Sequence, residues 1–207
     1  MVLWSQIPIF IATTNKTDDD PVVDISKSLG IPYFRGDEHH VLERFYRCAK
    51  KCKLEIVIRV TSDCPLIDGN LIAEGLDKYE KLANDNVYYS NSLQRSYPRG
   101  LDFEIFSFAQ LEGAYKNATE EAEKEHVTPY INQNKSGKTI LVNHIDSQDN
   151  SDLRWTLDTE SDWELLKTLF EVYNVANLPY QEIVKIIRTH PELEKINTHV
   201  KQKEIKL

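Results

Sequence analysis

Two aspartates, Asp63 and Asp158, each follow a short segment rich in apolar and β-branched residues. Pro65 stops the first of these patterns from continuing, and Thr159 begins a helix-capping sequence after the second. Because ligands of parallel sheets bind outside the carboxyl ends of the strands, we expect both carboxylates to line one crevice. Carboxylates suit Mg²⁺, which keeps its remaining positions for water and phosphate oxygens. The alternative is that each aspartate is an ordinary turn residue or cap.

A second group of polar side chains lies in the segment 97–104, which reads YPRGLDFE. Its alternation places Asp102 and Glu104 on one face of a strand, close to Arg99. These acids could bind sugar hydroxyls while Arg99 binds a carboxylate or phosphate. The alternative is a solvated edge strand with a local ion pair. His126 lies alone in a helix-like stretch, a pattern more typical of a core or surface histidine than of a ligand or base.

Strands and helices must alternate to position these residues. The sequence predicts strands at 7–14, 31–34, 54–60, 87–90, 101–106, 139–144 and 153–157. It predicts helices at 20–29, around 41–49, and at 69–82, 108–117, 120–132, 159–173 and 178–189, so the C-terminal end is helical from about residue 175. Short connections favour an α/β fold with a mostly parallel sheet and helices on both faces. Without a Gly-, Pro- or Ser-rich linker or a repeat, residues 1–207 are predicted to form one domain.

Composition excludes several classes of protein. The chain has 207 residues, 41% of them hydrophobic, with no apolar run of membrane-spanning length. Its formal charge of -8 argues against nucleic acid as a partner. The odd number of cysteines, three, does not indicate a disulfide framework. Because the N-terminal sequence lacks a secretory pattern, we expect a cytoplasmic protein.

Seven segments, in order along nearly the whole chain, resemble one family. They read ATTNKTDDDPVV, FRGDEHHVLERFY, RVTSDCPLID, YPRGLDFEIFS, EHVTPYI, LRWTLDTESDWELL and HPELEKINTHVKQK. The chain is similar to the cytidylyltransferase-like family of spore coat polysaccharide biosynthesis protein F, relatives of enzymes that make CMP-activated acidic sugars. The resemblance implies the Rossmann-like nucleotide-diphospho-sugar transferase fold and transfer of a cytidylyl group from CTP to a sugar.

The resemblance also assigns roles to residues. Asp63 and Asp158 match positions that hold magnesium in related enzymes. Arg99, Asp102 and Glu104 are then expected to position an acidic or amino sugar. The resemblance places Arg35 and Gly36 near the nucleotide, and His126 is kept as a further candidate for substrate binding. Relatives suggest a homodimer.

One part of the family pattern is not found. Members carry a first strand and a loop of the type QARMGSTRLPGK that holds the triphosphate, and the seven isolated glycines of this chain offer no substitute. We therefore expect that the first βα unit is missing and that activity is impaired, with Arg35, Arg95 and Arg99 as spare cations. The alternative is a non-catalytic relative that acts as a binding or partner subunit. A glycosyltransferase is disfavoured because the acidic residues 18–20 lie in a polar loop rather than in an Asp-x-Asp motif after a strand.

Overall fold

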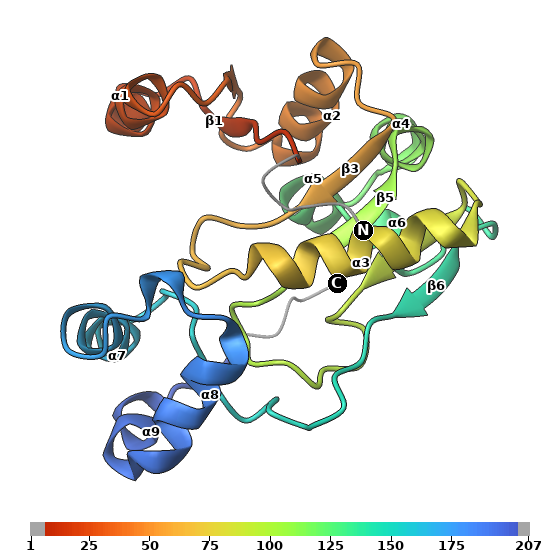
Figure 1. The fold of residues 1–207 in the computed structure, drawn as a ribbon. Coiled ribbons are helices and arrows are strands. Elements are labelled where there is room, and N and C mark those ends of the chain that lie inside the picture. The colour runs from red at the N-terminus through yellow and green to blue at the C-terminus, as the bar shows by residue number, and fades with distance from the viewer. Residues whose placement is uncertain (1–6, 203–207) are drawn as a thin grey trace.

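A four-stranded sheet forms the centre of the molecule, whose computed structural model describes residues 7–202 (Figure 1). The predicted domain 1–207 therefore extends at both ends beyond the described residues. The strand order is β3 (Ile56–Arg59), β5 (Glu104–Ser107), β4 (Val87–Ser90) and β6 (Ile140–Asn143). β4 pairs in parallel with β6, whereas β5 is antiparallel to both of its neighbours. β3, β4 and β6 thus share one direction, and their carboxyl ends share one edge.

The sheets are rich in parallel strands, as expected, but β5 runs against both of its neighbours. No crossover helix separates β4 from β5, so the chain turns back through residues 91–103 and enters between β3 and β4. A parallel connection would need a crossover of a dozen or more residues, usually a helix. β5 also begins later than the predicted strand 101–106, because residues 101–103 are held by Asn91 rather than by a neighbouring strand. The Asn91 side chain donates to Leu101 O at 2.8 Å and accepts from Phe103 N at 3.0 Å.

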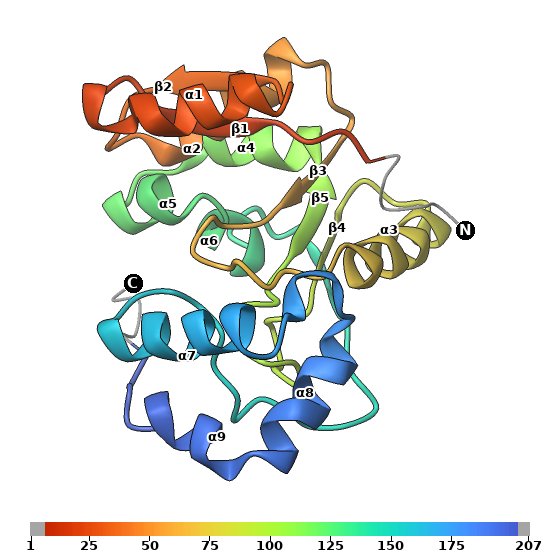
Figure 2. The same cartoon turned by 60° about the vertical axis from the view of Figure 1, so that its left-hand side comes forward.

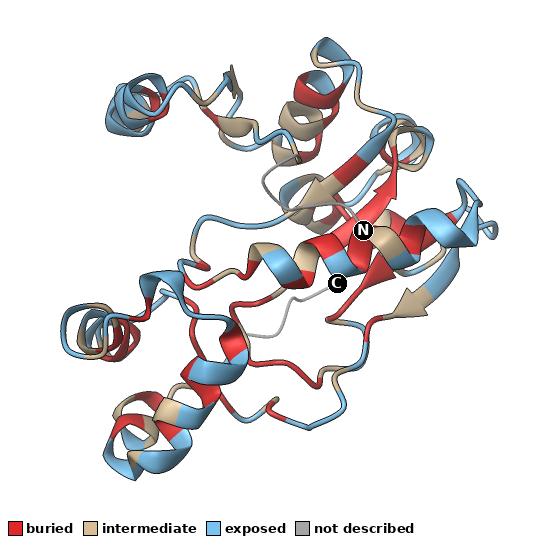
Figure 3. Ribbon diagram, in the orientation of Figure 1, coloured by how far each residue is buried: buried red, intermediate tan, exposed pale blue. Residues whose placement is uncertain are grey.

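Helices cover both faces of this sheet, as predicted. Alternate residues of each strand face opposite sides. Tyr89 and Ile105 belong to the core cluster that includes α3 (Gly69–Leu82), whereas Tyr88 and Phe106 belong to the cluster that includes α2 (Val41–Lys51) and α4 (Phe108–Asn117). Figure 3 shows the buried residues concentrated on β4, β5 and the inner sides of these helices.

A second, two-stranded parallel sheet lies above α2 in Figure 2. It pairs β1 (Ile11–Thr14) with β2 (Tyr33–Gly36), and the short 3-10 turn η2 (Thr17–Asp19) and helix α1 (Asp20–Ser28) connect them. β1 is shorter than the predicted strand 7–14. Its carboxyl end is closed by Asp19, which accepts hydrogen bonds from Thr13 Oγ1 at 2.8 Å and from Thr14 N at 3.0 Å. The Thr14 hydroxyl also donates to Asp19, and this bond together with the other two holds the pKa of Asp19 at about 2.

The predicted helix 120–132 is two helices, α5 (Glu121–His126) and α6 (Pro129–Asn132). Val127 between them has φ 72°, so the helix cannot continue through it. Pro129 then stands in the first turn of α6, where its missing backbone donor costs no helical hydrogen bond, so a new helix begins there. A single periodic pattern therefore conceals two short helices.

Helices form the C-terminal part of the described chain, as predicted. They are α7 (Glu160–Glu171), the 3-10 turn η3 (Val175–Asn177), α8 (Tyr180–Thr189) and α9 (Pro191–Asn197). The segment 153–157 that precedes them was expected to be a strand but makes only an isolated parallel bridge between Arg99 and Arg154. No helix within residues 7–202 has the length and apolarity needed to cross a membrane.

A buried ionic network lies where β3, β4 and β5 meet. Glu104 is 8% exposed and pairs with Arg59 of β3, whose guanidinium also lies 5.5 Å from the Phe45 ring centroid. The other carboxylate oxygen of Glu104 accepts a hydrogen bond from the Tyr88 hydroxyl and another, at 2.6 Å, from Thr128 Oγ1. Glu104 therefore does not open onto a crevice with Asp102, which corrects the expectation of a shared sugar-binding face. Strand alternation orients a side chain, but the cation opposite Glu104 comes from a strand distant in sequence.

Replacing Gly100 by alanine is expected to lower the free energy of unfolding by at least about 2 kcal/mol, because positive-φ strain adds to steric overlap. Gly100 has φ +104°, and an added Cβ would lie 2.7 Å from Trp155 C and 2.8 Å from Thr156 N. Gly113→Ala is the control. In α4 an added Cβ meets nothing within 4 Å, so stability should stay unchanged or rise by up to about 1 kcal/mol. Urea unfolding checks both variants, and equal stability would contradict the packing described.

Glu104→Gln is expected to destabilise the protein by about 3 kcal/mol, because it leaves the buried Arg59 charge without its partner. The control is Glu121→Gln, which removes an exposed pair with Lys124 and should leave the stability close to that of the wild type. Chemical denaturation measures both changes. A Glu104→Gln protein of normal stability but impaired sugar binding would instead restore the substrate-binding interpretation.

Candidate active site

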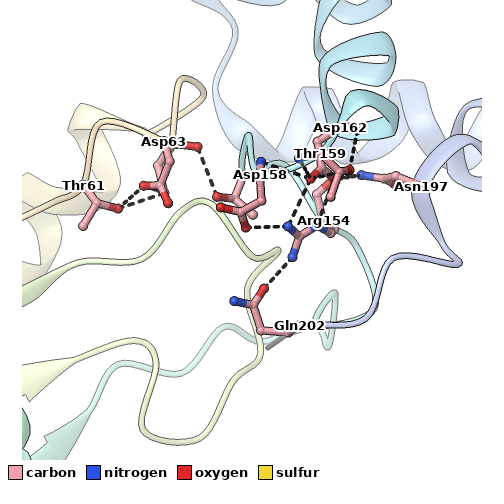
Figure 4. A network of polar contacts seen from close by, with 10 residues as sticks. Thr61, Asp63, Arg154, Asp158, Thr159, Asp162, Asn197 and Gln202 are labelled. Atoms are coloured by element: carbon pink, nitrogen blue, oxygen red, sulfur yellow. Dashed lines mark hydrogen bonds and ion pairs between the residues drawn. The ribbon is translucent and has the colours of Figure 1, made fainter. Parts of the chain in front are cut away.

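Asp63 and Asp158 lie next to one another although 94 positions separate them in the sequence (Figure 4). Leu157 N donates to Asp63 O at 2.8 Å, and Thr156 Oγ1 donates to the same carbonyl at 3.1 Å. Asp63 is half-buried and Asp158 is exposed. The loop after β3 and the segment before α7 therefore present both aspartates at the edge where β3 ends.

Each of these carboxylates keeps one oxygen without a protein donor among residues 7–202. Asp63 Oδ1 accepts from Thr61 Oγ1, and Asp158 Oδ2 accepts from Arg154 at 2.6 Å. Asp63 Oδ2 and Asp158 Oδ1 have no such partner in the described chain. Hard divalent cations prefer oxygen ligands, so this donor pair fits Mg²⁺. Because no group of three or more His, Cys, Asp or Glu side chains in the described chain could hold a metal, such an ion would rely on water and substrate oxygens as well.

The loop that carries Asp63 is held at its far end by Asp68. The Asp68 side chain caps α3 by accepting from Asn70 N at 2.8 Å, and its second oxygen accepts from Tyr180 N at 3.0 Å. Cys64, beside Asp63, is buried, and this burial raises the pKa of its thiol to about 12. The thiol therefore stays protonated at neutral pH, which disfavours it as a nucleophile.

The segment that carries Asp158 is held by a buried arginine. Arg154 donates a hydrogen bond from Nε to Asp162 Oδ1 at 2.9 Å. One of its terminal nitrogens donates to both Asp158 Oδ2 and Asp162 Oδ2. Its other terminal nitrogen donates to Gln202, and Asn197 of α9 donates to Asp162 Oδ1 at 2.8 Å. Burial alone would raise the pKa of Asp162, but the bonds from Arg154 and Asn197 hold it at about 2.

The predicted capping sequence at the start of α7 is confirmed. Thr159 Oγ1 accepts from Asp162 N at 3.3 Å, and Asp162 Oδ2 accepts from Thr159 N at 3.0 Å. This capping box sets where α7 begins. It also fixes the backbone beside Asp158, whose own N–H donates to Asp162 Oδ2 at 3.1 Å.

Arg99 supplies a cation whose charge interacts with Asp158. Its backbone is bound to the segment before Asp158, because Arg99 N donates to Leu153 O at 2.9 Å and Trp155 N donates to Arg99 O at 2.7 Å. Burial lowers the pKa of its guanidinium and Arg95 lowers it further, whereas Asp102 and Asp158 act in the opposite direction. No ion pair or hydrogen bond of the Arg99 guanidinium is found with another described residue. Arg95 and Asp102 instead form a bidentate pair with each other.

The remaining candidates serve other parts of the fold. Arg35 donates to Thr14 O at 2.7 Å and to Asp20 at 2.6 Å, so it closes the loop after β1 and is not a spare cation. Gly36 lies against Arg44, whose side chain would be 3.0 Å from an added Cβ. His126 is half-buried at the end of α5, and within the described chain its side chain makes no hydrogen bond or ion pair with Asp63 or Asp158.

Sequence reasoning missed two arginines that support the site. Arg154 and Arg59 each interrupt an otherwise apolar segment, LRWTL and IVIRV. A charged residue in a buried strand needs a carboxylate partner, so this interruption was the available signal. The partners themselves, Asp162 and Glu104, could not be assigned without the tertiary structure.

Comparisons with known proteins identify the family of this chain. A family model described as cytidylyltransferase matches residues 4–204. An uncharacterised protein of Methanocaldococcus jannaschii is 34% identical over 196 residues, which are 94% of this chain and 79% of that protein. Spore coat polysaccharide biosynthesis protein SpsF of Bacillus subtilis is 26% identical over 89% of this chain and 76% of its own.

A solved structure shows the same fold. It is a cytidylyltransferase from Leptospira borgpetersenii, with a TM-score of 0.85 and 27% sequence identity, and the match covers 94% of this chain and 80% of that one. The family match spans nearly the whole chain, and the structural match supports it independently. The chain belongs to the cytidylyltransferase family.

Proposed function

We propose that this protein transfers a cytidylyl group from CTP to a sugar with the help of Mg²⁺. The observation that supports this proposal most directly is that Asp63 and Asp158 lie side by side. Each of them has one carboxylate oxygen without a protein donor in the described chain. In the proposed reaction the sugar oxygen attacks the α-phosphorus of CTP in line, and pyrophosphate leaves. Bound at the two carboxylates, Mg²⁺ would supply charge neutralisation on the phosphate oxygens.

The protein residues orient the substrates around this centre. Asp63 and Asp158 hold the ion, and Arg99 offers its guanidinium to a phosphate or to the carboxylate of an acidic sugar. Asp102 acts through Arg95, which it holds beside Arg99. Arg35 and Gly36 shape the loops at the carboxyl end of the two-stranded sheet. Glu104 is assigned to the core instead of the sugar.

The substrate class follows from the family and from Arg99. The similarity to a spore coat polysaccharide biosynthesis protein supports a sugar destined for a surface polysaccharide. We expect an acidic or amino sugar, because the carboxylate of an acidic sugar could pair with Arg99. We expect the protein to work as a homodimer. A non-catalytic binding subunit is the competing function, and it predicts that CTP binds without releasing pyrophosphate.

Asp63→Asn and Asp158→Asn are each expected to lower the rate of pyrophosphate release by at least about 10²-fold, because each removes charge that holds the metal against the phosphate. The assay contains Mg²⁺, CTP and a panel of acidic and amino sugars. Both variants should also bind Mn²⁺ more weakly in an electron paramagnetic resonance titration. Asp149→Asn, in an exposed loop, is the control and should match the wild type. Undiminished Mn²⁺ binding and turnover in both site variants would refute the metal assignment.

Arg99→Met is expected to raise KM for the anionic substrate that Arg99 contacts by about 10-fold or more. A loss of this size corresponds to the free energy of one hydrogen bond between charged groups. Steady-state kinetics with CTP and sugar varied separately identifies this substrate. A rise for CTP indicates phosphate binding, whereas a rise for an acidic sugar alone indicates carboxylate binding. Arg47→Met, which removes an exposed ion pair on α2, is the control. Unchanged KM for both substrates would exclude a binding role for Arg99.

A further inference from the structure

Arg154 contacts the carboxylate of Asp158 and is itself held on all sides. Its side chain is 9% exposed, and its three nitrogens donate to Asp158, Asp162 and Gln202. Asp162 is fully buried, and Asn197 of α9 binds both Asp162 Oδ1 and, at 3.0 Å, the carbonyl of Arg154. The guanidinium therefore has little freedom to leave Asp158.

We infer that Arg154 is a positioning residue that fixes one oxygen of Asp158 and presents the other to the metal ion. The inference rests on the proposed function, because it takes Asp158 as a metal ligand. Arg154 binds Oδ2 only, at 2.6 Å, and Oδ1 receives no donor from the described residues. A carboxylate held in this way loses less rotational freedom when it binds a cation. Groups that orient a ligand from behind usually affect metal affinity as well as geometry.

The same contacts include residues from the C-terminal end of the described chain, which therefore helps to hold Arg154 in place. Asn197 ends α9, and Gln202 lies beyond it, yet both reach the Arg154 and Asp162 pair. Figure 4 shows Asn197 and Gln202 on either side of the arginine, at a distance from Asp63. A change in α9 should therefore reach the metal site through Arg154 without touching a metal ligand.

The test replaces Arg154 by lysine. Lysine keeps the positive charge beside Asp158 and Asp162, but its single nitrogen cannot serve both carboxylates in the planar geometry of arginine. The dissociation constant for Mn²⁺, measured by electron paramagnetic resonance without nucleotide, should rise by about 10- to 100-fold. Asn197→Ala should cause a smaller rise in the same direction. Titrations are done well below the unfolding temperature of each variant, with folding checked by circular dichroism.

Arg188→Lys is the matched control. Arg188 also binds an aspartate through two nitrogens, donating to Asp152 at 2.7 and 2.8 Å, but it makes no contact with Asp158. This variant loses a bidentate pair and should keep the wild-type affinity for Mn²⁺. An equal loss of affinity in Arg188→Lys would show a general effect of destabilisation and overturn the inference.

The outcomes separate this inference from the proposed function. If Asp158→Asn abolishes Mn²⁺ binding and folded Arg154→Lys binds as tightly as the wild type or more tightly, the metal site stands and the positioning role fails. If the wild type binds no Mn²⁺, or Asp158→Asn has no effect, the metal assignment fails and the inference fails with it. Weakened binding in Arg154→Lys and Asn197→Ala, with Arg188→Lys unchanged, supports both.

Discussion

The hydrogen bond from Leu157 N to Asp63 O joins two distant parts of the chain, and the candidate site depends on it. It holds the loop after β3 against the segment that leads into α7, so that both aspartates face one edge. Arg99 is bound to the same segment through Leu153 and Trp155. Close approach is possible because Gly100 has no side chain where the Trp155 backbone passes. Three separate parts of the sequence are thereby assembled by main-chain contacts, which position side chains more rigidly than flexible loops would.

Two arginines, the half-buried Arg59 and the buried Arg154, organise what surrounds this junction. Arg59 ties β3 to Glu104 of β5, and Arg154 ties the α7 start to α9 through Asp162. A buried charge is costly to leave unpaired, so each pair is retained or lost as a unit. The first pair joins two neighbouring strands within the sheet. The second pair extends to the exposed Asp158, because the terminal nitrogen of Arg154 that donates to Asp162 Oδ2 also donates to Asp158 Oδ2.

The expectations from sequence succeeded where the cause is local. The capping box at Thr159 follows from four adjacent residues, and the helices on both faces follow from alternating apolar strands. They failed where a contact with a residue distant in the sequence determines the local structure. The segment 153–157 has the composition of a strand but bonds to Arg99 and Asp63 instead of a sheet edge. The alternating pattern around Glu104 is typical of an exposed acidic side chain, yet Arg59 lies opposite Glu104 on the adjacent strand.

The sequence by itself determined the α/β class, most of the helices, and the two aspartates that end apolar segments, because periodicity and residue type act over a few positions. Only the tertiary structure decided the reversed direction of β5, the burial of Glu104, and the use of Arg154 to hold Asp158. These features depend on which segments pack against each other, and the partner of a buried charge is chosen by that packing. A single arginine in an apolar segment predicts that it pairs with a carboxylate, but the fold determines which carboxylate that is.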